Sequence, residues 1–104
     1  TGNFTATGDI ESTSDARLKE NVETIDNALE KVSNMRGVYF DMKARPGVRK
    51  VGLIAQEVEE VLPEVVSTSE EGEQIKSVAY ANIVGLLIEA VKELKEEVNQ
   101  LKGQ

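Results

Sequence analysis

The chain lacks cysteine, histidine and tryptophan, and it contains only two prolines. Without cysteine and histidine there is no thiol nucleophile, no zinc site of the usual ligand types and no Ser-His-Asp triad. No apolar run approaches the ~18 residues that a membrane span requires, and no signal peptide is visible. The composition therefore predicts a chain that works without a metal, a cofactor or a membrane.

Aromatic residues are also scarce, at 4% of 104 residues. A chain of this length forms one domain that buries about two-thirds of its surface when folded alone. Because its core is thin, we expect oligomerisation to contribute to stability. The net charge of −7 argues against a nucleic-acid partner, since such binders carry a basic face. The short basic run at 43–50 lacks interleaved aromatics and predicts a solvated loop.

The first part of the chain changes character near residue 14. Residues 1–13 are rich in Gly, Thr and Ser with short apolar alternation, which favours the end of a β-rich element, with a disordered leader as the alternative. A helix is then expected across 26–35, with Thr24 or Asp26 as its cap and Gly37 as its end. Its apolar face would consist of Ile25, Leu29 and Val32.

The middle of the chain predicts two hairpins. Residues 38–42 and 48–53 read as strands joined by the turn signal Arg45-Pro46-Gly47. Val65-Val66 and residues 74–78 read as a second pair across an acidic loop. Between the hairpins a short helix is expected at 55–62, with Pro63 ending it. These elements predict an α+β fold, a small mixed domain of short β-hairpins and helices.

The last segment, residues 79–102, predicts one long helix with a coiled-coil seam. Ile83, Leu86 and Ile88 widen the apolar stripe at its start, so we expect the first half to pack on its own domain and the second half on other copies. Glu97 and Lys102 occupy positions that can pair between parallel strands. The seam, with valine at a and leucine at d, comprises Tyr80, Val84, Leu87, Val91, Leu94, Val98 and Leu101.

One short motif, Ser14-Asp15-Ala16-Arg17-Leu18-Lys19, brings a hydroxyl and an amine together. A serine hydroxyl is a weak nucleophile until a base takes its proton, and lysine can be that base if burial or a nearby cation favours its neutral form. Arg17 is close enough in sequence to supply such repulsion. From the residues alone, a turn or cap at Ser14 and a surface lysine at Lys19 remain the simpler interpretation.

A second motif, Gly52-Leu53-Ile54-Ala55-Gln56-Glu57, reads as a strand-to-helix turn in which the glycine permits close packing. A functional interpretation would place Gln56 or Glu57 near a reacting peptide bond or a neighbouring copy. We favour the structural interpretation.

These two motifs and the terminal heptads, in this order, resemble the self-cleaving peptidase S74 family, the C-terminal intramolecular chaperone domain of phage tail spikes and tail fibres. The resemblance covers roughly residues 8–102. It implies that Ser14 is the nucleophile, that Lys19 is the general base and that the bond between Thr13 and Ser14 is cut once. Asn21 or a backbone N–H would be the oxyanion donor, and the other candidate supporting residues are Asp15, Gln56 and Glu57.

The resemblance also implies an organisation and a location. Residues 1–13 would end a β-rich fibre shaft, 14–78 would form the chaperone and autoprotease core, and 79–104 would form the coiled coil. Valine at a with leucine at d favours two strands in isolated coils, but the resemblance implies three, and we expect three because a fibre shaft imposes its own symmetry. The partners would be identical copies and the upstream shaft, and the parent protein would be a virion precursor assembled in the host cytoplasm. The alternative is a structural oligomerisation cap that never cleaves.

Overall fold

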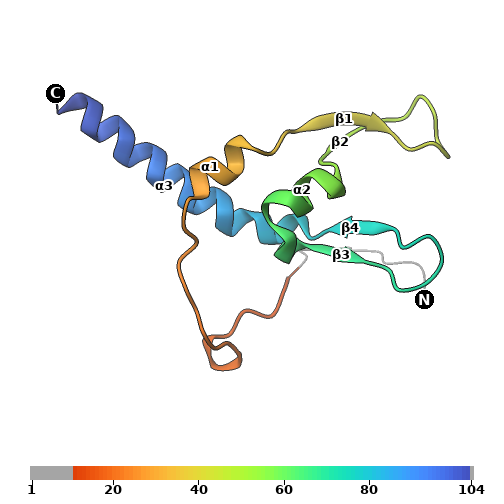
Figure 1. The fold of residues 1–104 in the computed structure, drawn as a ribbon, viewed down its shortest axis with the longest axis horizontal. Coiled ribbons are helices and arrows are strands. Elements are labelled where there is room, and N and C mark those ends of the chain that lie inside the picture. The colour runs from red at the N-terminus through yellow and green to blue at the C-terminus, as the bar shows by residue number, and fades with distance from the viewer. Residues whose placement is uncertain (1–10, 104) are drawn as a thin grey trace.

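A computed structural model describes residues 11–103 of the chain, and it shows a small α+β domain with an extended N-terminal arm (Figure 1). Two separate two-stranded antiparallel sheets and three α-helices make up the domain. The expected fold class is thus confirmed, whereas the coiled coil stays a prediction. The elements, in chain order, are α1 (Ala28–Ser33), β1 (Val38–Asp41), β2 (Arg49–Gly52), α2 (Ala55–Val61), β3 (Val66–Thr68), β4 (Lys76–Val78) and α3 (Ile83–Lys102).

Both predicted hairpins are present. In the first, β1 pairs with β2, and the turn between them contains Gly47 at φ +87°, a conformation that favours glycine. In the second, β3 pairs with β4. Val65 was expected in that strand, but it lies in a 3₁₀ turn that buries its side chain. Figure 1 shows both hairpins projecting to the side of the molecule opposite the C-terminal end of α3.

The core forms where α1 and α2 pack on the first half of α3. One buried cluster joins Ala28 of α1 to Leu86 and Ala90 of α3, and the other joins Val58, Val65 and Ile83. Partly buried apolar side chains surround the first cluster, namely Ile25, Leu29, Val32, Met35 and Leu62. The predicted apolar face of the first helix is therefore confirmed, as is the packing of the first half of α3 on its own domain.

The ends of two helices differ from the prediction. Helix α1 begins after Asn27, and neither Thr24 nor Asp26 caps it. Its C-terminal cap is Asn34, three residues before the expected Gly37, so the helix has only six residues. Helix α3 begins at Ile83 and is preceded by a 3₁₀ turn, Tyr80–Asn82, so the expected start at residue 79 was early. Ile88, expected to widen the packed face, is 52% exposed.

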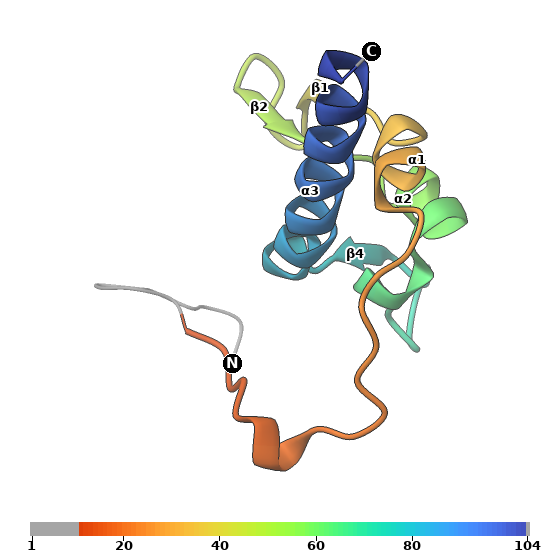
Figure 2. The same cartoon turned by 90° about the vertical axis from the view of Figure 1, so that its left-hand side faces the viewer.

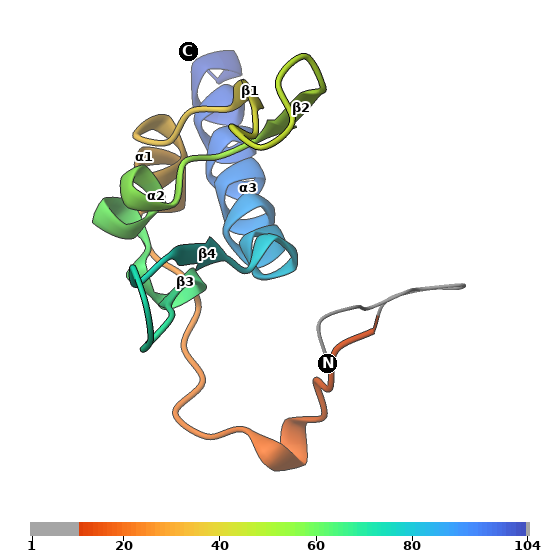
Figure 3. The same ribbon diagram turned by 90° about the vertical axis from the view of Figure 1, so that its right-hand side faces the viewer.

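An extended arm precedes α1. Every residue from 11 to 24 is exposed, and the only regular structure in this segment is a 3₁₀ turn, Ala16–Leu18. The views in Figures 2 and 3 agree that the arm swings away from the helices and hairpins. Most of the predicted shaft segment, residues 1–10, lies outside the described residues, and residues 11–13 form no strand. Across residues 11–103, no helix is long and apolar enough to cross a membrane.

Candidate functional site

The 3₁₀ turn in the arm brings the predicted nucleophile and base together. The backbone N–H of Leu18 donates to the carbonyl of Asp15 at 3.1 Å, and that of Lys19 donates to Ala16 at 3.2 Å. This turn folds the chain back on itself, so Lys19 Nζ donates a hydrogen bond to Ser14 Oγ at 2.7 Å. A nucleophile and a base within hydrogen-bond distance are the geometric requirement for nucleophilic catalysis.

Asp15 stabilises the turn that carries this pair. Its carboxylate accepts the backbone N–H of Arg17 at 2.9 Å, together with Nε of Arg17 at 3.1 Å and Nη2 at 2.8 Å. The Arg17 side chain lowers the pKa of Asp15, helped by the Arg17 backbone N–H, and the carboxylate raises the pKa of Arg17 in turn. The guanidinium is therefore matched by a carboxylate, which opposes the repulsion that we expected between Arg17 and Lys19.

Asn21, the candidate oxyanion donor, follows the pair closely. Its backbone adopts φ +55°, a left-handed conformation that asparagine tolerates better than most residues. Its side chain is exposed, and in the described part of the chain it makes no hydrogen bond. Asn21 therefore redirects the chain after Lys19, and its amide is open to solvent.

The two other supporting residues lie on α2, away from the arm. The Glu57 carboxylate accepts two hydrogen bonds from Arg36, both at 2.9 Å, and this pairing lowers the pKa of Glu57. Gln56 is exposed and lines an open groove between the two hairpins. Among residues 11–103, no hydrogen bond or ion pair joins the arm segment 11–22 to α2. The single chain thus does not bring Gln56 or Glu57 to the Ser14–Lys19 pair.

The structure supports the packing interpretation of the motif that begins at Gly52. The Tyr80 hydroxyl accepts from the backbone N–H of Leu53 at 3.0 Å. A Cβ added at Gly52 would lie 2.7 Å from that hydroxyl and 3.1 Å from a ring carbon of Phe40. Gly52 is therefore required for the close approach of Tyr80. Tyr80 itself lies outside α3 and binds its own domain, so only the six later seam residues lie on the α-helix.

The expected seam forms an uncovered apolar stripe along α3. All six of its residues on the helix are exposed in the single chain, by between 40% and 68%. At ~100° per residue, the stripe is centred about 90° around the helix from the buried Leu86 and Ala90, so it adjoins the packed face. It comprises Val84, Leu87, Val91, Leu94, Val98 and Leu101.

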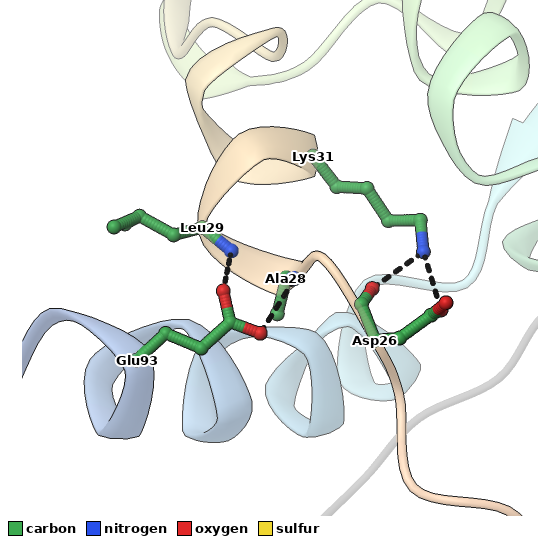
Figure 4. Close-up of polar contacts among 5 residues, drawn as sticks. All are labelled: Asp26, Ala28, Leu29, Lys31 and Glu93. Atoms are coloured by element: carbon green, nitrogen blue, oxygen red, sulfur yellow. Dashed lines mark hydrogen bonds and ion pairs between the residues drawn. The ribbon is translucent and has the colours of Figure 1, made fainter. Parts of the chain in front are cut away.

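Sequence reasoning missed one long-range contact of α1. Both carboxylate oxygens of Glu93 accept hydrogen bonds from the first turn of α1, from Ala28 N at 2.9 Å and from Leu29 N at 2.8 Å (Figure 4). No periodicity or motif marks Glu93, because its partners are backbone groups 65 and 64 residues earlier. Only the absence of a side-chain cap on α1 points to an acceptor from elsewhere.

Comparison with known proteins adds a family and a set of relatives. A family model described as "chaperone of endosialidase" matches residues 14–67, so the match begins at Ser14. The chain is 38% identical over 97 residues to the long tail fiber protein Gp37 of Enterobacteria phage K3, covering 88% of this chain and 8% of that protein. It is 39% identical over 108 residues to the Gp37 of Enterobacteria phage Ox2, covering 97% of this chain and 42% of that protein.

The chain therefore spans less than half the length of each of these relatives. On the family match, which covers the arm, both β1–β2 strands and α2, this chain belongs to the peptidase S74 family of chaperone domains.

Proposed function

We propose that this domain is an intramolecular chaperone that trimerises, brings an upstream phage fibre into register and then releases itself by cutting the bond between Thr13 and Ser14. The contact of 2.7 Å between Lys19 Nζ and Ser14 Oγ carries the proposal, because a structural cap has no need of it. The start of the family match at Ser14 supports the same boundary.

The proposed chemistry follows from the positions of the two groups. With the Lys19 amine uncharged, the direction of the hydrogen bond reverses and Nζ takes the Oγ proton as Oγ attacks the Thr13 carbonyl carbon. The peptide C–N bond then breaks, and the Ser14 amine leaves with the proton that Lys19 returns. An ester between Thr13 and Ser14 Oγ remains. Water hydrolyses it to a Thr13 carboxylate and a free Ser14 hydroxyl.

The apolar stripe on α3 supports association. Six exposed apolar residues in a heptad pattern form a surface that a folded monomer has little reason to expose. About three heptads are marginal as an isolated coil, so the domain packed on the first half of α3 would support the helix. We propose three strands, since the relatives are fibre proteins and a shaft imposes its symmetry on the domain that follows it.

Assembly would also prepare the site. Ser14 and Lys19 are exposed in the single chain, and water favours the charged form of an amine. Two apolar side chains close to Lys19, Leu18 and Val22, are 74% and 79% exposed. Covering them with neighbouring copies or with the shaft would remove water from around the amine and favour its neutral form. Cleavage would then follow assembly and not precede it.

The names of the relatives support a place in the virion. Each is a long tail fiber protein of a phage, and this chain matches a minor part of each one. We propose that the parent protein is a tail fibre or tail spike precursor that assembles in the host cytoplasm and loses this domain after the cut.

One observation favours the alternative of a permanent, non-cleaving cap. Among residues 11–103 no hydrogen bond is donated to the Thr13 carbonyl oxygen, and the Ser14–Lys19 pair is open to solvent. An oxyanion donor is worth a factor of roughly 10² to 10³ in rate, so a site without one cuts very slowly. The two functions share the trimer and differ only in the cut.

Expression of the domain with a longer upstream fibre segment tests the proposal. We expect two fragments on a denaturing gel and a mass that places the cut between Thr13 and Ser14. Ser14→Ala and Lys19→Ala should each leave one full-length band, because each removes one member of the pair. Ser12→Ala and Lys43→Ala are matched controls that should cut normally. A wild-type chain that stays intact in assembled trimers would favour the permanent cap.

A further inference from the structure

We infer that Glu93 is a positioning residue. It fixes the C-terminal end of the arm, where α1 begins, to α3, the helix through which copies are proposed to associate. The inference rests on the proposed self-cleavage, since it concerns how the Ser14–Lys19 pair is delivered to its place in the assembly. Glu93 does not touch the reacting atoms. It acts through the first turn of α1, where the arm ends.

Helix α1 depends on Glu93 for its N-terminal hydrogen bonds. The helix has six residues, and its N-cap Asn27 makes no side-chain cap bond. So short a helix is unstable alone, and its first N–H groups have no partner within the helix. Both oxygens of Glu93 supply those partners, as Figure 4 shows. The contact is charge-assisted and places negative charge at the positive end of the helix.

Asp26, two residues before α1, is held by a contact from within the helix. Lys31 Nζ donates to the backbone carbonyl of Asp26 at 2.7 Å and pairs with its carboxylate at 3.3 Å (Figure 4). Ile25 adds an apolar contact, because it packs against the cluster of Ala28, Leu86 and Ala90. The segment 25–31 thus packs on α3 through apolar contacts, and Glu93 supplies its hydrogen bonds to that helix.

Within residues 11–103, the arm makes no hydrogen bond or ion pair with the rest of the domain. Residues 11–22 make hydrogen bonds and ion pairs only among themselves within the described chain. The Ser14–Lys19 pair therefore sits on a tether whose fixed end is the start of α1. If α1 came loose, the tether would lengthen from about 13 to about 21 residues, which lowers the effective concentration of its free end about twofold.

Glu93 also lies on the helix that carries the seam. It follows Leu86 by two turns and so shares the face that packs on α1, whereas the neighbouring Val91 and Leu94 belong to the exposed stripe. One helix thus holds α1, from which the arm leaves, on one face and presents the proposed association surface on a neighbouring face. The orientation of α3 in the trimer consequently sets the point from which each arm leaves.

The experiment uses the same chain with its upstream fibre segment. Glu93→Gln removes the charge and one of the two acceptor oxygens, and Glu96→Gln makes the same change on the exposed part of α3. We expect Glu93→Gln to form trimers and to cut up to about twofold more slowly than wild type, with faster hydrogen exchange over residues 23–29. Glu96→Gln should match wild type in both readouts.

Val32→Ala separates positioning from stability. Val32 packs on the α1–α3 cluster but takes no part in the carboxylate contact, so this variant lowers the unfolding midpoint and leaves Glu93 in place. We expect its cleavage rate to stay at the wild-type value in assembled trimers. If Val32→Ala slows cleavage as much as Glu93→Gln at a similar loss of midpoint, Glu93 is only a stabilising residue and the inference is overturned.

The outcomes distinguish this inference from the proposed function. A wild-type chain that cuts while Glu93→Gln cuts equally fast overturns the inference alone. A wild-type chain that gives the same uncut band as Ser14→Ala overturns both. Should Glu93→Gln fail to assemble, Glu93→Asp keeps the charge on a side chain one methylene shorter. Assembled Glu93→Asp trimers that cut more slowly support positioning, and a wild-type rate overturns it.

Discussion

At the scale of single residues, Gly52 sets the distance between a strand and the residue that starts the C-terminal segment. The Tyr80 hydroxyl reaches the backbone of Leu53 because no Cβ stands in its way. This contact joins the end of β2 to the segment that leads into α3, across 27 positions of sequence. The link is local in space and distant along the chain.

Gly52→Ala should weaken this link. The added Cβ would lie 2.7 Å from the Tyr80 hydroxyl, so the ring must move and its bond with Leu53 must lengthen or break. We expect a loss of about 1 kcal/mol in the free energy of unfolding, the usual contribution of one hydrogen bond. Denaturant titration measures it. Gly37→Ala is the control, because no atom lies within 4 Å of its Cβ position, and an equal loss there would contradict the explanation.

Residue-level prediction worked where the chemistry is local. The Ser14–Lys19 pair is five positions apart, and a single 3₁₀ turn is enough to join it. The spacing therefore predicted the contact, although its catalytic role stays a prediction. Glu93 could not be predicted, since its partners are backbone N–H groups that any sequence would offer. Nor did the sequence separate Arg17 as a source of repulsion from Arg17 as a partner of Asp15.

At the scale of elements, α3 has to satisfy two packing surfaces at once. Its first half buries Ile83, Leu86 and Ala90 against the domain, while the stripe beside this packed face is exposed along the whole helix. The heptad pattern predicted the stripe, and the extra apolar residues predicted the packed half. The prediction was wrong about Ile88, because this residue lies about 200° around the helix from Leu86, on the side away from α1.

Leu86→Ala should destabilise the domain itself. Leu86 is fully buried between α1 and α3, and its truncation leaves a cavity where Ala28 and Ala90 are too small to fill it. We expect a loss of about 2 to 5 kcal/mol in the free energy of unfolding, measured by denaturant titration at a protein concentration too low for association. Leu101→Ala, at a position that is 68% exposed, should change it far less under the same conditions. Equal losses would show that α1 does not bury Leu86.

At the scale of the whole molecule, the single chain combines a small core with an uncovered apolar stripe. Six buried residues form the core of the described part, and six exposed apolar side chains follow one another along its longest helix. Association would cover that surface and add stability that depends on protein concentration. The arm and both hairpins would then occur once per copy around the shared helices.

Leu94→Asp tests association directly. A charge in the middle of the seam has no partner there, so we expect monomers in light scattering and a thermal midpoint that no longer rises with protein concentration. The far-ultraviolet circular dichroism of the hairpins and α1 should persist, since Leu94 is half exposed and outside the core. Asn99→Asp introduces the same residue off the seam and should remain associated. Trimeric Leu94→Asp particles would contradict the seam.

The absence of polar contacts between the arm and the domain affects how cleavage between Thr13 and Ser14 can be detected. Because residues 11–22 share no hydrogen bond or ion pair with the remainder of the described chain, a break between Thr13 and Ser14 removes no support from the helices or hairpins. Calorimetry and spectroscopy of the domain would give the same trace before and after the break. Only methods that report polypeptide length would register the event, and the liberated fragment should be recoverable as an intact, folded particle.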